Sequence, residues 1–289
     1  MSELDQFLKR AHAILDRLEG LLPEALPVAS TDSASSFRWR RRGSRGMLEE
    51  IRHSSPVVLA DLQCIDRQKE VIDRNTRQFL RGLPANNVLL AGPRGTGKSS
   101  LVKALLNAYR ADGLKLIEIG RDDVADLRDA GEAVGDKAGR FIVYCDDLSF
   151  EAGDAAYKSF KSAIDGSTGM MPENVVIYAT SNRRHLIPET MRENLDSRIV
   201  EGELHLSEAL EEKLSLSERF GIWLTFQPFD QDQYLAIVEY WLRRLGAPAA
   251  QPEVTRAALQ WALERGSRSG RSAWQFACDR TGRQRLRDA

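Results

Sequence analysis

The chain has 289 residues, of which 42% are hydrophobic and 29% are charged, a composition typical of a globular protein with one large domain or two smaller ones. Its 41 basic and 42 acidic residues leave a net charge of −1, which excludes a protein that attracts nucleic acid over its whole surface. No run of eighteen apolar residues occurs, and the three cysteines lack disulfide or metal-ligand spacing, so we expect a cytoplasmic protein without a membrane span.

The first 59 residues are predicted to precede the main domain. Apolar residues recur at helical spacing over 3–22, which predicts an amphipathic helix, and small residues at 27–36 indicate a linker. The segment FRWRRRGSRG, at 37–46, carries five arginines and two aromatic residues. It either binds a nucleic-acid backbone with aromatic stacking or docks on the core as a tether, and the near-zero net charge favours the tether.

Residues 60–229 are predicted to form an α/β core. A helix is expected at 66–82, and after it short apolar strands alternate with helical segments. Strands that are apolar along their whole length indicate a parallel sheet, here five-stranded, with helices on both faces. The predicted strands lie at 87–92, 114–120, 140–147, 174–182 and 222–227.

The remaining residues, 230–289, are predicted to form a separate all-helical lid. The apolar pattern becomes purely helical at 231–245, 253–265 and 271–286. The predicted fold class is therefore an α/β nucleotide-binding core with an N-terminal helical extension and a C-terminal helical lid.

The stretch GPRGTGKSS, which begins at Gly92, matches the phosphate-binding motif GxxxxGK[ST]. It follows a predicted strand and opens a predicted helix, where such a loop forms an anion-binding nest and the helix dipole adds to it. Lys98 is predicted to reach the β- and γ-phosphates of ATP, and the Ser99 hydroxyl to ligate Mg²⁺. The residues predicted to bind the nucleotide here are Gly92, Pro93, Arg94, Gly95, Thr96, Gly97, Lys98, Ser99 and Ser100.

Two adjacent aspartates, Asp146 and Asp147, end the predicted strand 140–147. Carboxylates at the carboxyl end of a buried parallel strand face the ligand site of an open α/β sheet. We expect Asp146 to hold Mg²⁺ through water and Asp147 to polarise the water that attacks the γ-phosphate. The alternative interpretation is a polar strand end that caps the next helix.

The order of these segments resembles that of an AAA+ ATPase: the P-loop, FIVYCDD, VVIYATSN, SLSERFG and a helical lobe with SGRSAWQF. In that family an asparagine after a core strand orients the lytic water, and Asn182 matches it. An arginine near the end of the core reaches the site of a neighbouring subunit, and Arg219, in a string similar to that of bacterial replication initiators, matches this arginine finger. The lid arginine that contacts the nucleotide is matched by Arg271, with Arg268 as a near rival.

Several longer sequence segments resemble one particular family. PANNVLLAGPRGTGKSSLVKALLNAY, CDDLSFE, YATSNRRHLIPE, EEKLSLSERFG and RSGRSAWQF are similar to the bacterial family designated domain of unknown function 815, over roughly residues 37–282. This resemblance implies ATP binding and an AAA+ fold but supplies no substrate. In AAA+ proteins the segment before the first core helix packs on adenine, so Leu62 and Ile65 are candidate contacts, although ordinary core roles explain them equally well.

The predicted function is Mg²⁺-dependent ATP hydrolysis coupled to self-assembly and to action on an unidentified protein or nucleic acid. The assembly is expected to be a ring, a hexamer among the candidates, or a filament. The candidate catalytic residues are Lys98, Asp147, Asn182 and Arg219. Most AAA+ hydrolases carry Glu where this chain has Asp147, and Asp is shorter by about 1.5 Å, so slow turnover is expected.

Two alternatives stay open. One is a nucleotide-dependent switch or loader that binds DNA through the arginines of 38–45 and hardly turns over. The other is a small-molecule kinase that uses the P-loop, which would need an acceptor pocket under a lid inserted within the core.

Overall fold

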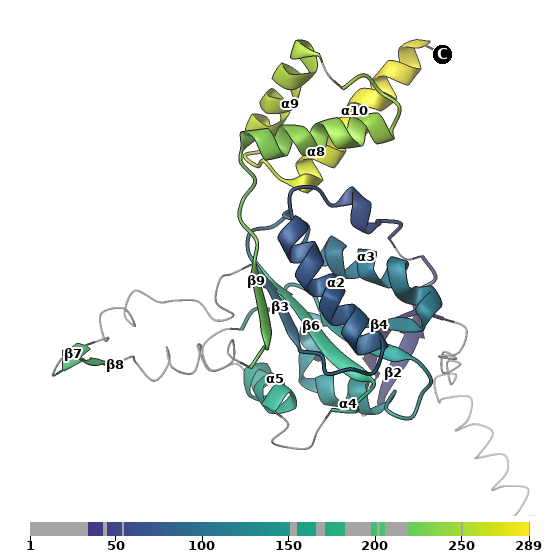
Figure 1. The fold of residues 1–289 in the computed structure, drawn as a ribbon, viewed down its shortest axis with the longest axis vertical. Helices are drawn as coiled ribbons and strands as arrows, with labels where there is room; N and C mark the ends of the chain where they lie inside the picture. Colours follow the sequence, from purple (N-terminus) through teal and green to yellow (C-terminus); the bar gives the residue numbers. More distant parts are fainter. Residues whose placement is uncertain are drawn as a thin grey trace, which may run out of the picture.

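The computed structural model describes residues 34–42, 45–53, 55–150, 155–165, 171–182, 198–200, 203–205, 219–249 and 251–288. The predicted helix at 3–22 and most of the predicted linker lie outside these residues. Within them, helices cover both faces of a central sheet, and three further helices stand beyond one end of it (Figure 1). None of the described helices is long and apolar enough to cross a membrane.

The central sheet has seven strands in the order β2-β1-β4-β5-β6-β3-β9. Five of them confirm the predicted strands and run parallel. The predicted count was too low by two, because β1 pairs in parallel with β4 and β2 pairs antiparallel with β1. The strands are β1 Ser36–Arg42, β2 Arg45–Glu50, β3 Val88–Ala91, β4 Leu114–Ile119, β5 Arg140–Cys145, β6 Val175–Ser181 and β9 Ile222–Thr225, and a separate pair joins β7 Arg198–Val200 to β8 Glu203–His205.

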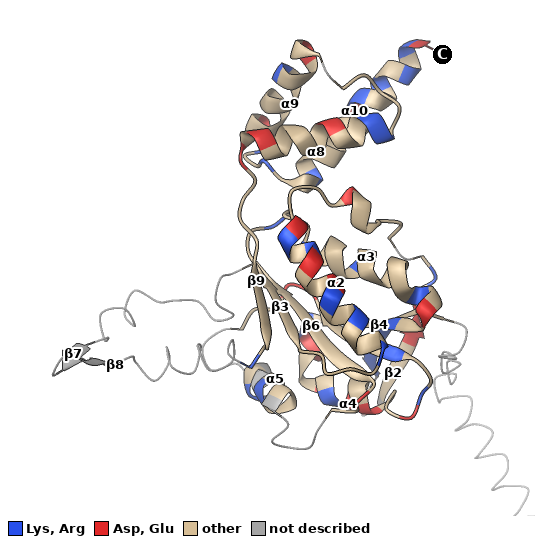
Figure 2. Ribbon diagram, in the orientation of Figure 1, with Lys and Arg blue, Asp and Glu red and all other residues tan. Residues whose placement is uncertain are grey.

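Strand β1 lies in the segment with the predicted basic run. Its side chains alternate, so Phe37 and Trp39 are buried at 0% and 3% exposure while Arg38 and Arg40 are on the other face and more exposed. The two aromatic rings therefore cannot stack on bases, which corrects the nucleic-acid interpretation; the segment docks on the core as a strand. Acidic and basic residues are interspersed along the ribbon, for example on α2, Asp66–Leu80 (Figure 2). The arginine pairs here are Arg38–Glu118 at 3.6 Å, Arg40–Glu49 at 3.6 Å and Arg41–Asp126.

Two cores lie on opposite faces of the sheet. Alternate strand residues join alternate cores: Val88 and Leu90 belong to the core that contains residues of α2 and α3, and Leu89 to the core with residues of α4 and α5. The elements are α2 Asp66–Leu80, α3 Lys98–Tyr109, α4 Leu127–Glu132 and α5 Ala155–Asp165, with 3-10 turns η1 Leu59–Asp61, η2 Arg110–Asp112 and η3 Arg121–Asp126.

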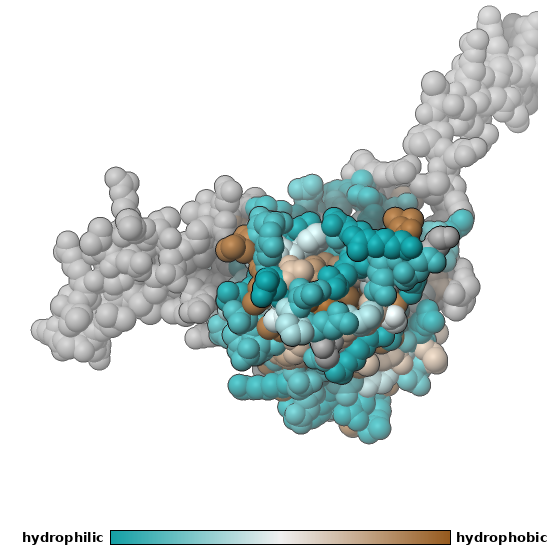
Figure 3. All heavy atoms as spheres, turned by 90° about the horizontal axis from the view of Figure 1, so that it is seen from above, coloured by the Kyte–Doolittle hydropathy of each residue, from teal (hydrophilic) through white to brown (hydrophobic). Residues whose placement is uncertain are grey.

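The three carboxyl-terminal helices confirm the predicted helical pattern: α8 Gln231–Arg244, α9 Pro252–Glu264 and α10 Gly270–Asp288. Asp230 caps α8, since its side chain accepts a hydrogen bond from the Gln233 N–H at 2.8 Å. The apolar core of this lid is continuous with the α2–α3 core, through Phe226 and Phe229. Seen from above, the described surface of the molecule is mostly hydrophilic, with apolar residues among the hydrophilic ones (Figure 3). The predicted domain boundary at 229/230 stays a prediction.

Candidate functional site

The glycine-rich loop joins β3 to α3 and is shaped by left-handed glycines. Gly92, Gly95 and Gly97 have φ angles of 142°, 78° and 100°, which favour glycine. At Gly92 a Cβ atom would also lie 2.3 Å from the Phe226 carbonyl oxygen, so a larger residue does not fit. The Thr96 hydroxyl donates to the Pro93 carbonyl at 2.9 Å and closes the loop on itself. This geometry is that of an anion-binding nest at a helix amino terminus.

Lys98 is buried at the first position of α3, at 5% exposure. Its ammonium donates to the carbonyls of Gly92 and Pro93 at 2.6 and 2.7 Å and to Asn182 Oδ1 at 3.1 Å. Burial lowers the pKa of Lys98 to about 8, although the nearby aspartates act in the opposite direction. The structure thus brings Lys98 and Asn182 together, because β3 and β6 are neighbours in the sheet.

Asp146 lies at the end of β5, and one of its oxygens collects three hydroxyl donors. Ser99, Tyr144 and Thr180 each donate to Asp146 Oδ1 at 2.7 Å. Burial raises the pKa of Asp146, but these hydrogen bonds outweigh it and hold the pKa below the usual 3.8. The carboxylate is therefore charged near neutral pH and sits against the Ser99 hydroxyl. Two such oxygen donors suit a hard divalent cation such as Mg²⁺.

Asp147 has a different environment from its neighbour. Its φ angle is 53°, a left-handed conformation uncommon for a residue other than glycine, and its N–H donates to Thr180 Oγ1 at 2.9 Å. Both carboxylate oxygens are engaged: Asn182 Nδ2 donates to Oδ1, and Arg94 Nη2 lies 3.2 Å from Oδ2. The three residues come from β5, β6 and the loop, so the fold joins segments that lie far apart in the chain.

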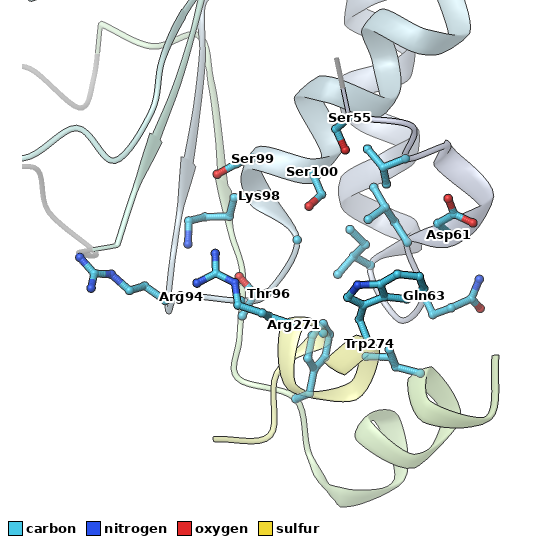
Figure 4. A pocket seen from close by; sticks show the side chains of 18 of the residues that line it. Ser55, Asp61, Gln63, Arg94, Thr96, Lys98, Ser99, Ser100, Arg271 and Trp274 are labelled. Atoms are coloured by element: carbon cyan, nitrogen blue, oxygen red, sulfur yellow. The ribbon is translucent and has the colours of Figure 1, made fainter. Parts of the chain in front are cut away.

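A cavity of about 720 Å³ opens beside these groups, between the core and the lid. The amino terminus of α10 closes on the loop, since the Gly270 N–H donates to the Gly95 carbonyl at 2.8 Å. Arg271 lines the cavity from the first turn of α10, whereas its rival Arg268 does not. Arg271 and Trp274 reach the cavity from the lid, and Arg94 points to the side opposite Gln63 (Figure 4).

Leu62 and Ile65 also line the cavity. Both are buried, and a Cβ atom at Gly97 would lie 3.4 Å from Ile65 Cδ1 and 3.9 Å from Leu62 Cδ2, so they pack against the phosphate loop. Both residues also belong to the α2–α3 core. Their role toward adenine therefore stays a prediction.

Several residues of the site, which line the cavity or bind Asp146, were missed from the sequence. Tyr144 and Thr180 each stand two residues before a predicted site residue on the same strand, so the two-residue strand period placed them on the same face. Trp274 follows Arg271 by three residues, which is a helical step. Its ring meets that of Trp241 edge-on, at 4.5 Å between centroids. The other missed residues include Asp61, Phe229, Ile237 and Arg244.

Arg219 is the predicted site residue that the structure keeps apart. It lies three residues before β9, at the amino edge of the parallel strands, whereas the glycine-rich loop follows the carboxyl end of β3. It is not among the described residues that line the cavity. Arg183 and Arg184, which follow Asn182, lie outside the described residues.

Comparison with known protein families identifies the family of this chain. The family described as "Protein of unknown function (DUF815)" matches residues 32–284, and the chain belongs to it. The fold is that of an AAA+ P-loop protein, which confirms the predicted fold class.

The chain is also similar to solved structures and to a curated relative. The Aeropyrum pernix ORC1 protein in complex with DNA has a TM-score of 0.52 at 17% identity, and the match covers 80% of this chain and 62% of that one. The Thermotoga maritima RuvB Holliday junction branch migration motor has a TM-score of 0.42 at 16% identity, over 76% of this chain and 71% of that one. The replication factor C large subunit of Sulfolobus acidocaldarius is 37% identical over 75 residues, which span 26% of this chain and 16% of that relative.

Proposed function

We propose that this chain binds ATP with Mg²⁺ in the cavity between core and lid and hydrolyses it slowly as part of a homo-oligomer. The observation that carries the proposal is the contact of the Ser99 hydroxyl with Asp146 at 2.7 Å. It stands beside the buried ammonium of Lys98, at the mouth of a left-handed glycine loop. An acidic pair, a hydroxyl, a lysine and a backbone nest in one place are the parts that phosphoryl transfer needs.

The phosphates would lie in the loop Gly92–Ser100, where backbone N–H groups and the dipole of α3 favour negative charge. Lys98 would exchange a carbonyl or amide partner for phosphate oxygens. The adenine would lie toward Leu62 and Ile65, which line the same cavity. Arg271 would contact the phosphates from the lid, so that bound nucleotide holds the lid against the core.

Ser99 and Asp146 would hold Mg²⁺, which when bound neutralises charge on the β- and γ-phosphates. The fit rests on donor chemistry, because both groups are oxygen ligands and Asp146 is kept ionised by its three hydroxyl donors. Tyr144 and Thr180 keep that carboxylate facing Ser99.

Asp147 would accept a proton from the attacking water while Asn182 orients it. The two side chains already touch, since Asn182 Nδ2 donates to Asp147 Oδ1. Aspartate reaches about 1.5 Å less far than glutamate, so we propose slow turnover. A comparison of kcat for the wild type and Asp147→Glu tests this, and a wild-type rate of tens per second would refute it.

Arg219 would complete the site of a neighbouring subunit. In its own chain it lies at the amino end of the parallel strands, whereas Lys98 lies beyond their carboxyl end. We therefore expect ATP turnover per protomer to rise with protein concentration. Mass measurements in solution of Asp147→Asn, with and without ATP, should show a larger assembly with ATP. A monomer with ATP bound, together with turnover strictly proportional to concentration, would contradict the proposal.

The macromolecule acted on would be a protein or a nucleic acid. The similar ORC1 structure is a complex with DNA, and the curated relative is a replication factor C subunit, which makes DNA a candidate. The arginines of β1 give it little support, since Arg38, Arg40 and Arg41 are paired with carboxylates. Co-purification with the ATP-bound Asp147→Asn variant, followed by DNA binding at low and high salt, separates the two.

A further inference from the structure

The site contains a connected series of four side chains that begins in the glycine-rich loop and ends at the first residue of α3. Arg94 pairs with Asp147 at 3.2 Å, Asp147 accepts from Asn182, and Asn182 accepts from Lys98 at 3.1 Å. Four groups that would act on the γ-phosphate or on water are therefore bound to one another. Each carboxylate oxygen of Asp147 thus has a hydrogen-bond partner, Asn182 at Oδ1 and Arg94 at Oδ2.

Arg94 is not needed for the phosphate cradle itself. The nest uses backbone N–H groups, and the motif requires only the residues Gly92, Gly97, Lys98 and Ser99. The Arg94 side chain is 76% exposed and reaches 53 positions along the chain to Asp147, whose side chain is 49% exposed. The Arg94 side chain therefore contributes little to packing, and its charge acts on Asp147.

The γ-phosphate would compete with Asp147 for Arg94 and with Asn182 for Lys98. An ammonium has three N–H donors, and those of Lys98 already go to two loop carbonyls and to Asn182. The bond to Asn182 is the longest of the three, so it is the one most readily exchanged for phosphate oxygen. Arg94 stands in the same loop, and its guanidinium can exchange a single carboxylate oxygen for a phosphate group of higher charge.

We propose that Arg94 is a positioning residue that restrains Asp147 in the empty site and releases it when the γ-phosphate of ATP draws the guanidinium away. This inference rests on the proposed function. The protein would then distinguish ATP from ADP through Arg94 of the glycine-rich loop, since ADP lacks the γ-phosphate that would draw Arg94 from Asp147. Release of Asn182 and Asp147 together then frees the two residues that place the water.

The test is a double-mutant cycle read by nucleotide affinity, which needs no hydrolysis. Wild type, Arg94→Met, Asp147→Asn and the double variant are titrated with Mg²⁺ and either AMP-PNP, a non-hydrolysable ATP analogue, or ADP. In the wild-type background, Asp147→Asn both removes a charge that repels the γ-phosphate and frees Arg94. In the Arg94→Met background it does only the first, so the difference isolates the exchange.

We expect Asp147→Asn to tighten AMP-PNP binding about two- to fivefold more when Arg94 is present than when it is Met, because an exposed ion pair has an effect of this size. The same cycle with ADP should show no such difference. Arg283 and Asp279, an exposed pair on α10 at 3.1 Å, provide a matched control cycle that should show none with either nucleotide.

Two results would overturn the inference. Equal gains from Asp147→Asn in both backgrounds, with both nucleotides bound, would mean that Arg94 does not exchange Asp147 for phosphate. A coupling of the same size with ADP would mean that the γ-phosphate plays no part. Failure of the wild type to bind either nucleotide would overturn the proposed function as well.

Discussion

Two neighbouring carboxylates at the end of β5 have different partners. Asp146 accepts three hydroxyl hydrogen bonds, all 2.7 Å long, whereas Asp147 is held by an amide and a guanidinium. Hydroxyl donors leave the second oxygen of Asp146 available for a cation's water shell. The left-handed φ angle of Asp147 turns its side chain away from that cluster, toward the tip of the glycine-rich loop. The backbone at one residue therefore separates the two roles.

The Tyr144 hydroxyl should stabilise the fold only while Asp146 is ionised. The folded-state pKa of Asp146 is below 3.8, so this stabilisation is present above that value and is lost as the pH falls through the folded pKa. Tyr144→Phe should lower the free energy of unfolding by about 1 kcal/mol near pH 7, and by less below about pH 4. Urea denaturation across this pH range measures it. Tyr178→Phe is the control, since its hydroxyl meets only Thr76 and Asn75 and its cost should not change with pH.

Lys98 should take up a proton when nucleotide binds at alkaline pH. Its pKa in the empty site is about 8, because burial disfavours the charged form, and phosphates would favour that form again. Uptake should be about 0.1 proton near pH 7 and roughly 0.7 proton near pH 8.5. Calorimetry of ATP binding in two buffers with different ionisation enthalpies measures it. The same uptake at both pH values would contradict the expectation.

At the level of elements, the close contact of α10 with the glycine-rich loop depends on Gly95. A Cβ atom there would lie 2.6 Å from Ser269 Cβ, and the φ angle is +78°. Gly95→Ala should therefore displace the lid and weaken ATP binding on the order of tenfold. Gly113→Ala is a matched control, since its φ angle is +87° and nothing lies within 4 Å of its added Cβ atom. It should lose similar stability through backbone strain but keep its ATP affinity, measured by calorimetry.

Two arginines of β1 should differ in their effect on stability. Arg41 pairs with Asp126, whose side chain is 6% exposed, whereas Arg40 pairs with Glu49, which is 58% exposed. Arg41→Ala should cost about 1–3 kcal/mol of unfolding free energy, because it leaves a buried carboxylate with fewer partners. Arg40→Ala should cost less than about 0.5 kcal/mol. Chemical denaturation of both variants measures this, and equal costs would rule out the buried pair as the reason.

At the level of the whole molecule, Arg219 precedes β9 whereas Lys98 follows the carboxyl end of the neighbouring strand β3, so the proposed action of both at one site involves a second copy of the chain. Arg219→Ala keeps its own phosphate loop, and Lys98→Met keeps its own arginine. A mixture of the two variants should therefore hydrolyse ATP faster than the sum of the separate proteins. Turnover equal to that sum would show that Arg219 does not act between subunits.

Much of the fold was predictable, because apolar runs and helical periods are local patterns. The five predicted strands, β3, β4, β5, β6 and β9, and the lid helices lie where these patterns predicted them. Strand β1 was not predicted, since its alternation of Phe37 and Trp39 with arginines was interpreted as a tether docked on the core or as a nucleic-acid contact, and not as a strand of the sheet. Only the acidic residues that face it from other segments, Glu118 and Asp126, reveal those arginines as paired.

The phosphate loop could be derived from nine consecutive residues, since glycine conformations, a lysine and a hydroxyl beside a helix start are contiguous in the chain. The groups that tune it are not contiguous. Tyr144 and Thr180, which donate to Asp146, come from two strands, and Asp147, the partner of Arg94, lies 53 positions from that arginine. Hydrogen bonds depend on distances of a few tenths of an ångström, which the packing of the sheet sets and the spacing along the chain does not.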